Sequence, residues 1–199
     1  MRGRFSEARA WVAQARAILT EFGLTYFLAH SRDVAALVET LAGDPASAEA
    51  ELRASYEELR EMGEKTFLAE NAAQLAQALY TQRRYDEADR FVRVSEEASS
   101  GRAQRAYWGP VRAKLLARRG DPDAAEGLAR ESVAIWAERD CLLWHGCAVM
   151  DLAEVLRLAG RPQQAVPIVE QALELFERKG IIPAAETTRA LLATLEPVA

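Results

Sequence analysis

The stretch Gly160-Arg161-Pro162-Gln163-Gln164-Ala165 has four variant copies elsewhere in the chain, and their spacing decides the fold. The other copies are Gly3-Arg4-Phe5-Ser6-Glu7-Ala8, Gly43-Asp44-Pro45-Ala46-Ser47-Ala48, Arg83-Arg84-Tyr85-Asp86-Glu87-Ala88 and Gly120-Asp121-Pro122-Asp123-Ala124-Ala125. The first positions of neighbouring copies are 40, 40, 37 and 40 residues apart. A nearly constant period of this size predicts a stack of helical hairpins, in which each unit buries its apolar face against its neighbours.

Between these copies, apolar residues recur at spacings of three and four, which is typical of amphipathic helices. The ranges with this pattern are 4–21, 24–42, 46–62, 66–82, 103–118, 141–159, 163–177 and 183–195. Glycines stand where most of these helices should end. We therefore expect an all-α fold in which each repeat has a helix A, a tight turn and a helix B.

Two series of alanines flank the turns. Seven residues before the turn positions lie Ala36, Ala76, Ala113 and Ala153, and five residues after them lie Ala48, Ala88, Ala125 and Ala165. A small side chain lets the two helices approach, and a larger one would overpack the joint by about 1–3 kcal/mol. This spacing resembles the tetratricopeptide repeat (TPR), although the period is longer than that repeat's 34 residues. The resemblance implies a TPR-like α-α superhelix of antiparallel hairpins.

One continuous solenoid is expected over residues 1–199. Its units are approximately 1–23 (a half repeat), 24–63, 64–101, 102–140 and 141–180, followed by a capping helix in 181–199. In the third turn Arg83 replaces glycine, so its backbone is expected to avoid a left-handed φ. Ser99-Ser100-Gly101 is expected to be the loosest loop of the array.

The two ends of the predicted array differ. The first helix has no helix A before it, so Phe5, Trp11, Val12 and Ile18 lack one packing partner. We expect these residues to be covered by another part of a longer protein or by a second copy in a homodimer. The last helix has a polar side that is typical of a solenoid cap, formed by Thr187, Thr188 and Arg189.

Composition narrows the class of protein. The 30 acidic residues outnumber the 25 basic ones, giving a net charge of −5, which argues against a nucleic-acid partner. The sequence shows no run of about 18 uncharged apolar residues and no signal-peptide pattern, so we expect no membrane partner and a cytoplasmic location. Cys141 and Cys147 are expected to be buried, reduced thiols.

No motif indicates a reaction, a metal site or a cofactor. Gly63-Glu64-Lys65-Thr66 lacks the glycine pattern and preceding strand of a phosphate-binding loop, and is better explained as a helix end. His30 and His145 lie on different predicted helices, without zinc-like spacing. Trp108, Trp136 and Trp144 flank one hairpin. Trp136 fits the apolar stripe of its helix, whereas the other two fit either the core or an aromatic anchor for a peptide.

The candidate binding surface is the inner wall of the array, formed by helix A positions that do not face helix B. Counting from each turn assigns to it Asp33, Gln77, Tyr80, Lys114, Arg118, Glu154 and Arg157. These residues are polar and mixed in charge. Two interpretations stay open: ordinary solvated helix faces, or a groove for an extended peptide or a partner helix.

Several segments resemble one family more specifically. They are Tyr56 to Lys65, Leu79 to Ala88, Val111 to Gly120, Asp151 to Arg161 and Phe176 to Gly180. Together they resemble the C-terminal TPR-like region of large bacterial signalling proteins, chiefly actinobacterial, in which an adenylate/guanylate cyclase domain and a P-loop ATPase precede the repeats. Similar regions follow ATPase-type transcription regulators.

That resemblance implies a non-catalytic module for protein interaction and regulation, belonging to a larger signalling or transcription-regulating ATPase. One alternative is the regulatory part of an adenylate/guanylate cyclase with its catalytic domains upstream. Another is a stand-alone scaffold that associates with itself through the first helix. The partner would be a protein or peptide, or other domains of the same polypeptide.

Overall fold

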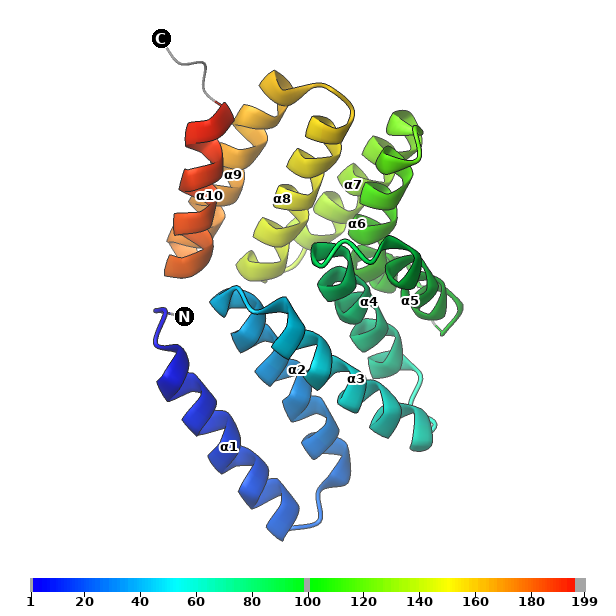
Figure 1. Cartoon of the computed structure of the whole chain (residues 1–199), viewed down its shortest axis with the longest axis vertical. Coiled ribbons are helices and arrows are strands. Elements are labelled where there is room, and N and C mark those ends of the chain that lie inside the picture. The colour runs from blue at the N-terminus through cyan, green and yellow to red at the C-terminus, as the bar shows by residue number, and fades with distance from the viewer. Residues whose placement is uncertain (1, 99–100, 196–199) are drawn as a thin grey trace. The chain divides into compact units, whose positions relative to one another are not determined.

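The computed structural model describes residues 2–98 and 101–195, and all regular secondary structure in these ranges is helical (Figure 1). The helices are α1 (Phe5–Glu21), α2 (Thr25–Ala42), α3 (Pro45–Glu61), α4 (Thr66–Thr81), α5 (Tyr85–Ala98), α6 (Arg102–Arg118), α7 (Pro122–Ala137), α8 (Leu142–Leu158), α9 (Pro162–Lys179) and α10 (Ile182–Leu195). These bounds confirm the predicted helices to within two residues at each end. Ser99 and Ser100 of the predicted loose loop lie outside the described residues.

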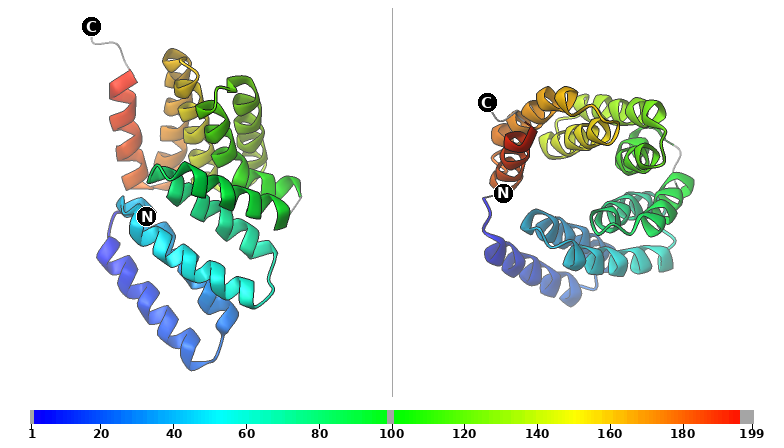
Figure 2. Two further views of the ribbon diagram at one scale, coloured as in Figure 1. Left: turned by 45° about the vertical axis from the view of Figure 1, so that its right-hand side comes forward. Right: turned by 45° about the horizontal axis from the view of Figure 1, so that its top comes forward.

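The chain forms two compact units, and each is described by itself. The N-terminal unit spans Gly3–Gln104, and the C-terminal unit begins at Arg105. The expectation of one continuous solenoid over the whole chain stays a prediction. In the N-terminal unit the helices A are α2 and α4, and the helices B are α1, α3 and α5. In the C-terminal unit the helices A are α6, α8 and α10, and the helices B are α7 and α9. Within each unit, successive helices pack side by side (Figure 2).

The turns are built by the residues that the repeated stretch predicts. Three helices B begin at the proline of that stretch, namely α3, α7 and α9. A proline costs little at the first helical position because the N–H it lacks would be unpaired there. Asp44 Oδ1 accepts a hydrogen bond of 3.0 Å from Ser47 N, and Asp121 Oδ1 accepts one of 3.2 Å from Ala124 N. Both aspartates therefore cap the N-terminus of a helix B.

The prediction for Arg83 is wrong, because its φ is +63°. Its N–H donates to Tyr80 O, and Arg84 N donates to Leu79 O, which is the hydrogen-bond pattern that Gly43 and Asp44 make at the end of α2. This arrangement requires a left-handed residue after the helix whatever its side chain. Arg83 therefore adopts a conformation that glycines adopt after α2, α6, α8 and α9.

The corner alanines lie in the core of the hairpins. All eight are at most 2 % exposed. In the C-terminal unit Ala113, Ala125, Ala153 and Ala165 belong to one core cluster with Val155 and Val169. Trp136, at 4 % exposure, is a core residue as predicted, and its Nε1–H donates to Ala106 O at 3.1 Å.

Two expectations about single residues need correction. Thr188 does not lie on a solvent side of the last helix: it is 1 % exposed, and its Oγ1 donates to Ala184 O and lies 3.8 Å from Met150 Sδ of α8. It is buried because α10 packs like a further helix A. Cys141 and Cys147 are free thiols, as expected, but both are partly rather than fully buried.

Candidate functional site

The seven predicted surface residues all lie on helices A, but they differ in exposure. Asp33 lies on α2, Gln77 and Tyr80 on α4, Lys114 and Arg118 on α6, and Glu154 and Arg157 on α8. Three of them are buried: Asp33, Tyr80 and Lys114. Gln77 and Glu154 are half-buried, and the two arginines are exposed. Their role in binding a partner stays a prediction.

In the N-terminal unit, Asp33 links α2 to α4. Asn71 Nδ2 donates to Asp33 Oδ1 at 2.7 Å, and His30 Nδ1 lies 3.4 Å from the other carboxylate oxygen. Burial raises the pKa of the Asp33 carboxyl, and the hydrogen bond from Asn71 opposes this shift only in part. Asn71 Oδ1 is also buried and accepts no hydrogen bond. The contact is therefore a helix-to-helix joint beneath the surface.

The two remaining residues of this unit lie near the end of α4. The buried Tyr80 ring packs against Tyr85, the first residue of α5, with the ring centroids 5.2 Å apart. Gln77 lies one turn earlier, and its backbone carbonyl accepts a hydrogen bond from Thr81 Oγ1. Tyr80 therefore helps to close the α4–α5 hairpin.

In the C-terminal unit, α6 and α8 are joined by an ion pair between a fully buried lysine and a partly buried aspartate. Lys114 is 0 % exposed, and its Nζ lies 2.5 Å from Asp151 Oδ1. Burial raises the pKa of the Asp151 carboxyl, while the Lys114 ammonium opposes the shift. Four residues after Lys114, Arg118 Nη2 lies 3.7 Å from Glu154 Oε1, at the partly exposed end of the same joint. Arg157 follows at the exposed end of α8.

Neighbouring helices A are thus held together by polar pairs in each unit, Asp33–Asn71 in one and Lys114–Asp151 in the other. Sequence reasoning assigned Asp33 and Lys114 to a binding surface, whereas the structure buries both side chains, and it missed their partners Asn71 and Asp151. These partners could have been found by comparing neighbouring helices A for complementary polar residues at similar distances from their turns. Since an unpaired buried charge is costly, a polar residue at such a level predicts a partner on the next helix A.

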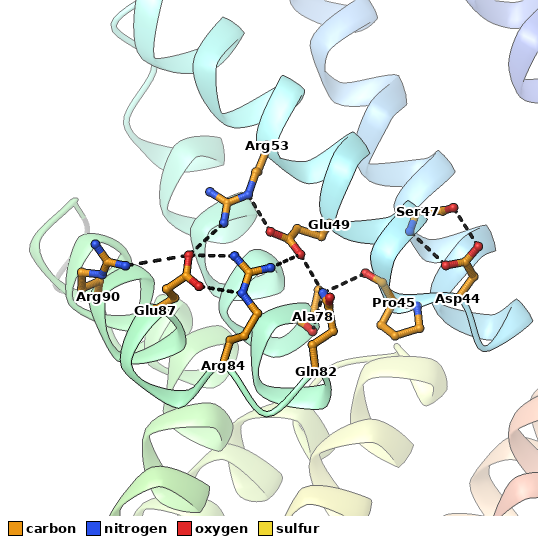
Figure 3. A network of polar contacts seen from close by, with 10 residues as sticks. All are labelled: Asp44, Pro45, Ser47, Glu49, Arg53, Ala78, Gln82, Arg84, Glu87 and Arg90. Atoms are coloured by element: carbon orange, nitrogen blue, oxygen red, sulfur yellow. Dashed lines mark hydrogen bonds and ion pairs between the residues drawn. The ribbon is translucent and has the colours of Figure 1, made fainter.

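A second polar network lies between helices B of the N-terminal unit (Figure 3). Glu49 of α3 accepts hydrogen bonds from Arg53 Nε, Gln82 Nε2 and Arg84 Nη1 at 2.7, 2.7 and 2.6 Å. Burial raises the pKa of Glu49, but these three donors outweigh it and hold the pKa below its ordinary value. Arg84 also donates twice to Glu87 of α5.

The C-terminal unit repeats this joint. Glu126 of α7 accepts from Arg130 one turn later and from Arg161 at the next turn, the latter at 2.6 Å. Glu126 and Arg161 stand at the repeat positions of Glu49 and Arg84. The network therefore has a structural role, because it ties one hairpin to the next at the turn.

An aromatic group surrounds Trp136. Trp144 stacks on it with ring centroids 6.2 Å apart, and Tyr107 meets it edge-on at 5.0 Å. The guanidinium of Arg139 lies 5.3 Å from the Trp136 ring centroid. Trp108 is buried and Trp144 is half-buried. The group is thus mainly core, and a peptide-anchoring role for Trp108 or Trp144 stays a prediction.

The described residues contain no group of three or more histidine, cysteine or acidic side chains arranged to hold a metal ion. Within the same ranges, no helix has the length and apolar character needed to cross a membrane.

Gly63 ends its helix with a φ of +70°, and α4 begins at Thr66, as the helix-end interpretation predicts. Burial lowers the pKa of His145, and the charge of Arg178 adds to the effect.

Comparison with known proteins identifies the fold. The chain matches no protein-family profile and no curated protein sequence. It is similar to solved TPR-like repeats of a putative kinesin light chain from Podosopora anserina, with 18 % identity, a TM-score of 0.52 and 89 % of each chain covered. The structure of a single-substitution variant of those repeats gives 17 % identity, a TM-score of 0.53 and the same coverage.

A third solved structure, BtubC (BKLC) from P. vanneervenii, is 15 % identical, with a TM-score of 0.56, 98 % of this chain covered and 92 % of that chain. At such low identity these likenesses speak for the fold alone. The fold is all-helical and TPR-like, as the spacing of the repeated stretch predicts. Repeats of this kind are typical of protein-interaction modules.

Proposed function

We propose that the chain is a non-catalytic module that binds a protein or an extended peptide along its helices A, in the cytoplasm and without nucleic acid. The observation that carries the proposal is the joint between α6 and α8. The ion pair between the buried Lys114 and Asp151 joins the two helices, and Arg118, Glu154 and Arg157 lie further along them at or near the surface. Binding to helices that are already held in place loses little conformational entropy.

Charge reversal of the two arginines tests this proposal. The immobilised wild-type chain, an Arg118→Glu/Arg157→Glu variant and an Arg178→Glu/Lys179→Glu control are incubated with extract of the organism that encodes the protein. The control makes the same charge change in the same unit, at exposed positions of helix B. We expect mass spectrometry to find a set of proteins retained by wild type and control but lost from the first variant. Identical sets for all three would remove this surface from the account.

We further propose that the chain is part of a larger bacterial signalling or transcription-regulating ATPase, with the regulatory part of an adenylate/guanylate cyclase as the alternative. The support is the resemblance of the five segments between Tyr56 and Gly180. Sequencing the genomic DNA upstream of the Met1 codon tests the proposal, which predicts an in-frame ATPase or cyclase motif.

Turnover of ATP or GTP with Mg²⁺ by the isolated chain would contradict the non-catalytic assignment.

Self-association through α1 is a second candidate function, favoured by a specific observation. Trp11 and Ile18 are 63 % and 47 % exposed on one side of α1, and no residue of this helix is buried. Large apolar side chains grouped in this way mark interaction surfaces.

A further inference from the structure

Helix α1 exposes the face that a helix A covers in the complete pairs. The face consists of Ala8, Val12 and Ala15, flanked by Trp11 and Ile18. Ala8 and Val12 are partly exposed and Ala15 is exposed. The residues 40 positions after Ala8, Val12 and Ala15, on α3, are at most 2 % exposed. In the described part of the chain, α1 is thus a helix B whose own helix A position is open.

Helix α10 exposes the complementary face. Adding the 40-residue period to the corner alanine Ala153 gives Ala193. Ala153 is fully buried against its helix B, whereas Ala193 and Ala190 are exposed. α10 packs on α9, and its Thr188 meets Met150 of α8, so it occupies the place of a helix A. Its side for a helix B is open.

We infer that α10 of one copy packs against α1 of a second copy, so that the two chains complete a helical pair between them. The inference deepens the proposed self-association. In this arrangement Ala193 meets Ala8 of the second copy, as the corner alanines meet within each hairpin. A second copy is the occupant because both halves of the joint, with the corner alanine in register on each, belong to this one sequence.

The existing pairs indicate which other residues would meet. A Cβ on Gly109 of α6 would lie 3.5 Å from Leu128 and 2.6 Å from Ser132 of α7. The residues at the corresponding repeat positions are Arg189 on α10 and Trp11 and Ala15 on α1. Arg189 is already oriented by a 2.6 Å contact with Glu177. A guanidinium beside a tryptophan ring gains a favourable cation–π contact.

One residue of α10 opposes this contact. Glu186 lies one 40-residue period after Gly146 of α8. The Phe176 ring of the facing helix α9 occupies the space that a Cβ on Gly146 would need. The α1 residue at the level of Phe176 is Leu19, which is smaller and leaves room for the stem of the glutamate. The carboxylate must still lose water, which weakens the contact. Replacing Glu186 with alanine should therefore strengthen association.

The proposed interface joins two different surfaces, so it is heterologous. After pairing, one copy keeps an open α1 and the other keeps an open α10, so further copies add head to tail into an open chain or a closed ring. A symmetric α1-to-α1 dimer would instead stop at two copies.

Complementation between two variants tests the inference. Trp11→Glu blocks the α1 face, Ala193→Glu blocks the α10 face, and Ala10→Glu is the control on the outer side of α1. All three positions are exposed, so the variants should fold, which circular dichroism checks. We expect sedimentation velocity to show concentration-dependent assemblies for wild type and control, and monomers for each blocked variant. An equimolar mixture of the two blocked variants should form a one-to-one dimer, since each supplies the face that the other lacks.

Other outcomes would overturn the inference. If Ala193→Glu assembles like wild type while Trp11→Glu is monomeric, self-association is symmetric through α1 and the head-to-tail arrangement is wrong. If wild type stays monomeric up to millimolar concentration, self-association itself is wrong. In Glu186→Ala, assembly should begin at a lower concentration than in wild type, and unchanged or weaker assembly would count against the α10 contact.

Discussion

Asp33 has a buried carboxyl group, and burial disfavours the charged form of this group. Because burial raises its pKa above the value in the unfolded chain, the folded state keeps a proton where the unfolded state has lost it. Stability contributed by this group is therefore present at low pH and lost as pH rises through the folded-state pKa. In Asp33→Asn this loss disappears, and the amide oxygen can still accept from Asn71.

We expect the free energy of unfolding of Asp33→Asn, minus that of wild type, to grow as pH rises from about 4 to 8. Urea unfolding across this range measures it, with Asp86→Asn as an exposed control in the same unit. Asp151 also titrates with a raised pKa, but it is present in both proteins and cancels in the difference. A difference that is flat or falls with pH would contradict the buried position of Asp33.

Cys147 should be an unreactive thiol in the folded chain. The residue is partly exposed, but desolvation of its thiol, together with the charge of the neighbouring Asp151, raises the pKa of this thiol to about 12. At pH 8 only about one thiol in ten thousand is then ionised, and the thiolate is the reactive form. In a Cys141→Ser background we expect iodoacetamide to modify Cys147 about a thousandfold more slowly in the native protein than in urea. Equal rates would show that the thiol is accessible and ionised.

At the scale of the helix, the corner alanines set how closely two helices approach. Ala76 of α4 is fully buried against the facing α5. Ala76→Leu should cost about 1–3 kcal/mol in the free energy of unfolding, because the added carbons have no space to fill. Ala50→Leu, on the exposed side of α3, is the matched control and should change stability by less than about 0.5 kcal/mol. Equal effects at both positions would contradict close contact at the corner.

The turn between α4 and α5 offers a stabilising change. Arg83 has a φ of +63°, where a residue with a Cβ costs about 1–2 kcal/mol relative to glycine. Arg83→Gly removes this strain but frees the unfolded chain, which offsets about 0.4–1 kcal/mol. We expect a net gain of up to about 1 kcal/mol in urea unfolding. Gly43→Ala, at the equivalent turn with a φ of +78°, should be destabilising. A loss of stability in Arg83→Gly would show that the side chain matters more than the backbone.

At the scale of the whole molecule, the repeated stretch was enough to predict the helices and their pairing, because helical periodicity and corner alanines are local features. The surface was harder to predict. Counting from the turns placed Asp33 and Lys114 on the inner face, but their burial depends on Asn71 and Asp151 of the next helix A. Arg83 shows the same limit, since the hydrogen bonds that end α4 overrode the preference of its side chain.

The proposed binding surface and the head-to-tail joint both require that each helix A meets its helix B at two alanines. Nuclear Overhauser effects between selectively labelled alanine methyl groups test this most directly. The account predicts cross-peaks for four pairs: Ala36–Ala48, Ala76–Ala88, Ala113–Ala125 and Ala153–Ala165. If these pairs give no cross-peaks while alanines of non-neighbouring repeats do, the chain is not a stack of helical hairpins.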